Sequence, residues 1–174
     1  LPACVGSLNP TMEVGDTIDD FAIVGYHDSE GNGYFGTDGK LAEPLELLRL
    51  SDFKDRKIIL FVLSAAWCVP CLNETKQFSK WITAYGSKGL AIFQALSDGQ
   101  QKGSVPTTGD LRLWLKASLA AGAAIGVDTT DASSPYNTKG SVPHNMIIDA
   151  KTLKVLAKGF SSAQTEAEIQ KHLQ

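Results

Sequence analysis

The most informative stretch of the sequence is Ile58-Ile59-Leu60-Phe61-Val62-Leu63-Ser64-Ala65-Ala66-Trp67-Cys68-Val69-Pro70-Cys71. Its first residues form an unbroken apolar run, which predicts a fully buried strand over 57–64. The segment 72–85 carries apolar residues at the spacing of one helical face, so we expect a helix there. The two cysteines therefore lie where a strand passes into a helix. Unpaired N–H groups and the helix dipole favour negative charge at such a point, and the thiolate is the reactive form of cysteine.

The spacing of Cys68 and Cys71 permits three interpretations. Residues i and i+3 lie on one side of the first helical turn, close enough for a disulfide. A purely structural bridge would close a loop too short to remove much entropy from the unfolded chain. A zinc site needs about four ligands, whereas His27, His144 and His172 are scattered along the sequence. The motif favours a redox-active dithiol over a structural disulfide or a metal site.

Size and composition limit the class of protein. With 174 residues, of which 43% are hydrophobic and 20% charged, the chain fits one soluble globular domain. The net charge of −3 offers no basic surface for nucleic acid. No apolar run approaches the ~20 residues that cross a bilayer. We expect a monomer.

The N-terminus offers one route to a membrane. Leu1-Pro2-Ala3-Cys4 loosely resembles a bacterial lipoprotein box, in which the cysteine carries the lipid. The alternative is a free thiol in a frayed terminus. We expect a flexible leader over 1–13 and a single domain over 14–174.

The rest of the chain alternates between short strand and helix patterns. Strands are predicted at 21–26, within 45–53, and at 90–96, 123–127, 146–149 and 155–160, and helices at 111–121 and 165–173, with Asp110 and Thr165 as N-caps. This order predicts an α/β fold with a central mixed β-sheet, helices on both faces and an N-terminal β extension.

A Gly-rich segment separates the first two predicted strands. Asp28-Ser29-Glu30-Gly31-Asn32-Gly33-Tyr34 partly matches a calcium-binding EF-hand loop, but Gly39 stands where the bidentate glutamate belongs. A loop or small hairpin over 27–44 is therefore the preferred prediction.

Four stretches resemble the thioredoxin superfamily, and within it the extracytoplasmic TlpA/ResA-like (AhpC/TSA-related) thiol-disulfide oxidoreductases. They are Val14-Gly15-Asp16-Thr17-Ile18-Asp19-Asp20-Phe21, Leu50-Ser51-Asp52-Phe53, Ser64-Ala65-Ala66-Trp67-Cys68-Val69-Pro70-Cys71-Leu72-Asn73-Glu74 and Ser141-Val142-Pro143-His144-Asn145-Met146-Ile147-Ile148-Asp149. Their order and separation match the family over 14–174, and the WCxPC and VP…ID motifs are specific in combination.

The resemblance implies a thioredoxin-like fold and a role for each residue of these motifs. Cys68 attacks a substrate disulfide, and Cys71 resolves the mixed disulfide. Pro143 is the family's cis-proline, which leaves the backbone of Val142 free to pair with an extended substrate.

Other motif residues surround the thiols. The resemblance places Trp67, Val69 and Pro70 in the substrate platform. Glu74 takes the position of a glutamate that handles protons for Cys71; the alternative is a solvated glutamate in the first helical turn. His144 replaces the usual Thr and would lower the pKa of Cys68 if it were protonated nearby; the alternative is a loop histidine facing solvent.

The expected function is thiol-disulfide exchange with a protein substrate of the cell envelope, as a specific reductant. The family requires no cofactor beyond the redox-active Cys68–Cys71 disulfide, and an upstream electron donor would restore the thiols. The expected location is periplasmic or extracytoplasmic. The alternative is a non-catalytic binding module that holds a partner or copper. Copper-handling relatives of this fold carry a CxxxC spacing, so the CxxC spacing here weighs against copper.

Overall fold

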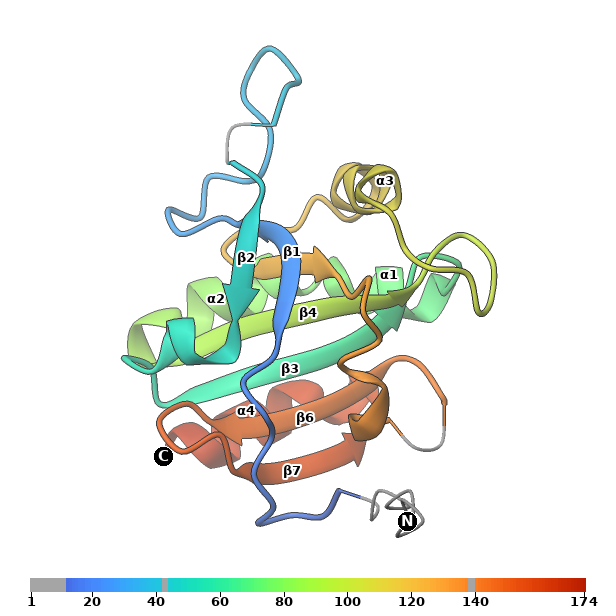
Figure 1. Cartoon of the computed structure of the whole chain (residues 1–174). Coiled ribbons are helices and arrows are strands. Elements are labelled where there is room, and N and C mark those ends of the chain that lie inside the picture. Colours follow the sequence, from blue (N-terminus) through green and yellow to red (C-terminus); the bar gives the residue numbers. More distant parts are fainter. Residues whose placement is uncertain (1–11, 42–43, 138–139) are drawn as a thin grey trace, which may run out of the picture.

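The fold is built on one mixed sheet of seven strands. In a computed structural model that describes residues 12–41, 44–137 and 140–174, the strand order is β2-β1-β5-β4-β3-β6-β7 (Figure 1). The strands are β1 (Ala22–His27), β2 (Glu46–Arg49), β3 (Ile58–Ala65), β4 (Leu90–Asp98), β5 (Ala124–Val127), β6 (His144–Asp149) and β7 (Val155–Phe160). The pairs β3–β4 and β4–β5 are parallel and the remaining pairs are antiparallel.

Helices connect or follow the central strands. They are α1 (Val69–Thr75), α2 (Phe78–Tyr85), α3 (Thr108–Ser118) and α4 (Thr165–Leu173), with short 3-10 helices η1 (Leu50–Phe53), η2 (Gly86–Lys88), η3 (Ser134–Tyr136) and η4 (Ser162–Gln164). The segment predicted as one helix at 72–85 is divided, because α1 ends before Gln77 and α2 begins at Phe78.

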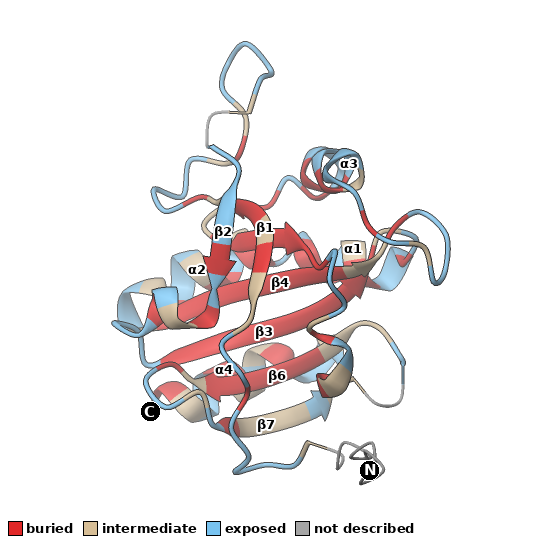
Figure 2. Ribbon diagram, viewed as in Figure 1, coloured by how far each residue is buried: buried red, intermediate tan, exposed pale blue. Residues whose placement is uncertain are grey.

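The central strands are buried on both faces. Every residue of β3 is buried (Figure 2), as the continuous apolar run predicts. Alternate residues of β3 enter different core clusters: Leu60 joins one that contains apolar residues of α1, α2, α3 and α4, whereas Phe61 joins the other. All four α-helices of the described residues thus pack on one face of the sheet.

Single 3-10 turns and the N-terminal segment cover the opposite face. Phe53 of η1, Tyr136 of η3 and Ile18 belong to that second cluster. The α/β class, the mixed sheet and the flanking helices are confirmed. The arrangement differs in detail from the prediction, because the helices on the second face are short 3-10 turns while every long helix lies on the first.

Two predicted helix caps are wrong by a few residues. Thr107, not Asp110, caps α3: its Oγ1 accepts from Asp110 N–H at 3.2 Å, and Asp110 Oδ2 accepts from Thr107 N–H at 2.8 Å. This is a reciprocal capping box, in which Asp110 is the third residue. The N-cap of α4 is Gln164, one residue before the predicted Thr165, which is the first helical residue and is buried.

The first described residues already contact the sheet. Lys158 of β7 donates to the carbonyl of Met12 and forms an ion pair of 3.1 Å with Glu13. Met12 and Glu13 belong to the stretch 1–13 that was predicted to be a flexible leader. Cys4 lies outside the described residues.

The Gly-rich loop after β1 is organised around one carboxylate. Asp28 is buried, and its oxygens accept from the backbone N–H groups of Asn32, Gly33 and Gly122 at 3.0, 2.8 and 2.7 Å. An isolated bridge between Phe35 and Leu41 makes a small hairpin further along. The carboxylate that begins the EF-hand-like pattern therefore holds the loop together through backbone N–H groups.

Candidate active site

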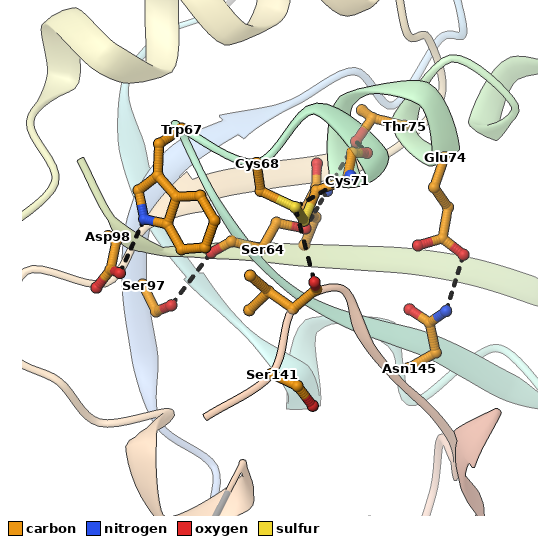
Figure 3. The surroundings of a disulfide bond; sticks show 12 residues. Ser64, Trp67, Cys68, Cys71, Glu74, Thr75, Ser97, Asp98, Ser141 and Asn145 are labelled. Carbon is orange, nitrogen blue, oxygen red and sulfur yellow. Dashed lines mark hydrogen bonds between the residues drawn. A yellow bond between two sulfur atoms is a disulfide. The ribbon is translucent and has the colours of Figure 1, made fainter. Parts of the chain in front are cut away.

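The cysteine pair forms a disulfide at the carboxyl end of β3. The Cys68 and Cys71 sulfurs are 2.02 Å apart and the Cα atoms 5.3 Å apart (Figure 3). Cys68 is the N-cap residue of α1, and its sulfur accepts from the backbone N–H of Cys71 at 3.2 Å. Once the bridge is reduced, the same N–H points at the Cys68 sulfur and stabilises negative charge on it.

Little of either sulfur is exposed to solvent. Cys68 is 2% exposed and Cys71 is fully buried. The Cys68 Sγ lies 3.8 Å from the carbonyl oxygen of Val142. The peptide bond between Val142 and Pro143 is cis, the geometry that the resemblance implies for this proline.

Exposed apolar side chains stand next to Cys68 in the chain. Trp67 is 38% and Val69 66% exposed, so they are available for contact with a partner. Pro70 is exposed beside them. The Trp67 indole N–H donates to Asp98 Oδ2 at 3.0 Å, and the same oxygen accepts from Gly103 N–H at 3.1 Å. Asp98 thereby fixes the orientation of the tryptophan.

Glu74 is buried instead of solvated. It is 3% exposed, and its Oε1 accepts from Asn145 Nδ2 at 2.8 Å and from the Thr165 hydroxyl at 3.0 Å. Figure 3 shows the carboxyl directed at Asn145. Burial raises the pKa of Glu74, and the hydrogen bonds from Thr165 and Asn145 oppose that rise. The alternative of an exposed first-turn glutamate is wrong.

Two oxygens of the Glu74–Asn145 pair have no hydrogen-bond partner. Among the described residues, Glu74 Oε2 and Asn145 Oδ1 are both buried acceptors without one. A buried carboxylate oxygen without a donor disfavours the charged form of the group. This acts in the same direction as the raised pKa of Glu74.

Sequence reasoning missed a second buried network, centred on Gln94 of β4. Gln94 Nε2 donates to the hydroxyls of Ser64 and Thr75, both at 2.8 Å, and its Oε1 accepts from Trp114 Nε1 at 3.1 Å. The Thr75 hydroxyl donates in turn to the Cys71 carbonyl at 2.9 Å. This network joins β3, β4 and α3 to the cysteine helix. A polar residue inside the apolar run of β4 is the signal that could have found it.

His144 is the first residue of β6 and pairs in register with Leu63 of β3. It directly follows the cis peptide bond and is partly buried, so it is not the fully solvent-facing loop histidine of the alternative prediction.

The buried carboxyl of Glu74 predicts a specific pH dependence of stability. Below the ordinary value of 4.5 the group is protonated in both the folded and the unfolded state. As the pH rises above that value, the unfolded state ionises first, so the wild type loses stability until the pH passes the raised pKa of the folded state. The unfolding free energy of Glu74→Gln relative to wild type should therefore increase over this window. Denaturant unfolding of the oxidised proteins at a series of pH values measures it.

The exposed Glu30→Gln substitution is the matched control and should leave the difference from wild type independent of pH. A Glu74→Gln difference that stays constant over the same range would show that the carboxyl does not stay neutral on folding.

The fold and the site define a class. A thioredoxin-like sheet that places a CxxC disulfide at the start of a helix is the architecture of thiol-disulfide oxidoreductases. The model of the redoxin family matches residues 13–170, so this chain belongs to the redoxin family and is a thioredoxin-like oxidoreductase. A comparison with curated protein sequences finds no match.

Solved structures with the same fold carry related descriptions. One, described as a thiol:disulfide interchange protein DsbE from Chlorobium tepidum, has a TM-score of 0.69 and 22% identity and covers 94% of this chain and 100% of its own. The thioredoxin domain of a thiol-disulfide oxidoreductase from Bacteroides vulgatus has a TM-score of 0.64 and 18% identity. The match covers 94% of this chain and 100% of that domain. The exposed lipoprotein thioredoxin Etrx1 of Streptococcus pneumoniae has a TM-score of 0.60 and 22% identity. The match covers 88% of this chain and 99% of that chain.

Within the described residues, no group of three or more His, Cys, Asp or Glu side chains is arranged to hold a metal ion. Nor does any helix there have the length and apolarity to cross a membrane.

Proposed function

We propose that this protein reduces disulfides in partner proteins of the cell envelope through Cys68 and Cys71. The observation that carries the proposal is the position of the Cys68 sulfur, which lies 3.8 Å from the Val142 carbonyl and next to the exposed Trp67 and Val69. An extended substrate segment that pairs with the Val142 backbone would bring its disulfide to this sulfur. The low exposure of Cys68 supports selectivity among partner disulfides.

The exchange proceeds in two displacements. The Cys68 thiolate bonds to one sulfur of the substrate disulfide, and the other substrate sulfur leaves as a thiolate. The Cys71 sulfur then attacks Cys68 Sγ, so that the Cys68–Cys71 bond forms and the second substrate thiol leaves. Two electrons pass to the substrate, and its two leaving thiolates take their protons from solvent. A separate dithiol donor must reduce the protein again.

Glu74 accepts the proton that Cys71 loses when it attacks. The two residues lie one helical turn apart on α1. The oxidised state is the product of this step, and in it Glu74 Oε2 is buried without a hydrogen-bond donor, which favours a proton on this carboxyl. His144 assists at the other sulfur, where a protonated imidazole beside the cis-proline turn would favour the Cys68 thiolate.

An extracytoplasmic location accompanies this function. Disulfide exchange with secreted proteins takes place in such compartments, and the pneumococcal neighbour is described as an exposed lipoprotein. A lipid on Cys4 would anchor the chain. Intact mass of the protein from its native host tests this, since an unmodified Cys4 would contradict the anchor.

Turnover of a protein disulfide tests the proposal. With dithiothreitol as donor, the wild type should accelerate insulin reduction, whereas the Cys68→Ser/Cys71→Ser double variant should match the uncatalysed rate. Metal content of the same samples provides the counter-test. Stoichiometric copper without insulin reduction would support a binding module and contradict the reductase.

A further inference from the structure

A separate cavity of about 240 Å³ opens beside the cysteine pair. Its apolar wall consists of Leu63, Trp67 and Val142. Of these, Trp67 directly precedes Cys68 in the chain and Val142 lies beside its sulfur. Pockets that hold a whole small-molecule ligand are typically about 300–1,000 Å³. The size of this cavity therefore suits one long side chain.

The opposite wall is polar and carries more negative than positive charge. Among the described lining residues, Asp98 and Asp131 are acidic and Lys102 is basic. Asp98 is partly buried, whereas Lys102 is exposed on its loop. Within the described part of the chain, the hydrogen bonds to the Asp98 carboxylate come from Trp67 and Gly103 and both use Oδ2, so Oδ1 can receive a further donor. In Figure 3 Trp67, Ser97 and Asp98 lie together on one side of the disulfide.

The cavity lies where a bound substrate would place a side chain. A segment that pairs with the Val142 backbone runs past Cys68, and successive side chains of an extended chain point to opposite sides. Val142 lies beside the Cys68 sulfur and Trp67 precedes Cys68 in the chain, and both line the cavity. A residue flanking the substrate disulfide would therefore be directed into the cavity.

We propose that this cavity is a specificity subsite for a lysine or arginine that flanks the disulfide of the substrate protein. The proposal rests on the reductase function proposed above. The aliphatic stem of such a side chain would lie against Leu63, Trp67 and Val142, and its cationic head would meet Asp98 and Asp131.

Other side chains fit the two walls less well. A purely aliphatic side chain would remove water from Asp98 without giving Oδ1 a donor, which costs free energy. A glutamate would place a third carboxylate beside Asp98 and Asp131, with only the exposed Lys102 to offset it. A planar guanidinium could also stack on the Trp67 indole.

Three matched peptides test the subsite. Each is closed by one intramolecular disulfide and differs only beside that disulfide, where it carries Lys, norleucine or Glu. Norleucine keeps the lysine stem but lacks its charge. Fully reduced protein should reduce the Lys peptide about fivefold faster than the norleucine peptide, and the Glu peptide more slowly than either. The Lys advantage should shrink at high salt, because the cavity is open to solvent.

Substitutions in the cavity separate local from overall charge. Asp131 has a positive φ of 59°, which asparagine also tolerates, so Asp131→Asn keeps the backbone and removes one charge. This variant should lose most of the ratio of Lys to norleucine rates, and Asp98→Asn should lose it as well. The exposed Asp55→Asn removes a charge outside the cavity and should keep the wild-type ratio.

Two results would contradict the proposal in different ways. If the wild type reduces all three peptides at one rate, or if Asp131→Asn and Asp98→Asn keep the Lys advantage, the subsite is wrong and the reductase function stands. If the reduced protein leaves all three peptides oxidised, the reductase function itself is wrong, and the subsite with it.

Discussion

Cys71→Ser is expected to accumulate a stable mixed disulfide between Cys68 and its substrate, whereas Cys68→Ser is expected to lose exchange almost completely. Without the nucleophile at residue 68 no first displacement takes place, so the rate should fall about a thousandfold or more, on the order of 4 kcal/mol of barrier. Without the resolving thiol at residue 71 the first displacement still proceeds, but the second does not. Intact mass spectrometry of each variant after incubation with an oxidised peptide measures both effects.

The assignment of the two cysteines rests on their surroundings. The Cys68 sulfur accepts a backbone N–H and faces the Val142 carbonyl, whereas Cys71 is fully buried behind it. If Cys68→Ser instead trapped the substrate through Cys71, the roles would be reversed. Both variants should remain folded, because a bridge that closes so short a loop contributes little to stability.

Gln94→Leu is expected to lower the unfolding free energy by about 2–6 kcal/mol. Leucine nearly fills the same volume, so the loss comes from the polar partners left behind in the core. The Trp114 indole N–H and the Ser64 hydroxyl would both be buried without Gln94, and each such group costs about 1–3 kcal/mol. Denaturant unfolding of the oxidised protein measures the change.

The matched control for Gln94→Leu is Gln101→Leu, at an exposed position of the loop after β4. It should change stability by no more than about 0.5 kcal/mol. Equal effects of the two substitutions would show that the network around Gln94 contributes nothing to stability.

The sheet and the position of the cysteine pair could be predicted from the sequence because both depend on local patterns. The apolar run of β3 predicts burial from its length alone, and the CxxC spacing fixes two sulfurs on one turn. The Val142–Pro143 turn, 71 residues beyond Cys71 in the chain, required the family resemblance, since no local pattern joins it to the thiols.

The polar networks could not be predicted in the same way. Glu74 meets Asn145 and Thr165 across 71 and 91 residues of sequence, and a first-turn glutamate is usually solvated. Only the packing of α4 and β6 against α1 decides that its carboxyl is buried. Similarly, a helical pattern does not specify which face of a sheet it covers, so the placement of all four α-helices on one face had to come from the structure.

The most direct measurement is timed alkylation of the reduced protein with iodoacetamide between about pH 5 and pH 10, with mass spectrometry to locate the label on residue 68 or 71. If the N-terminus of α1 stabilises a thiolate at Cys68, that residue is alkylated first. The pH at which its alkylation rate is half-maximal should also lie below that of free cysteine, about pH 8.5. Equal, slow reaction of both cysteines, with midpoints at or above that value, would contradict a nucleophilic Cys68.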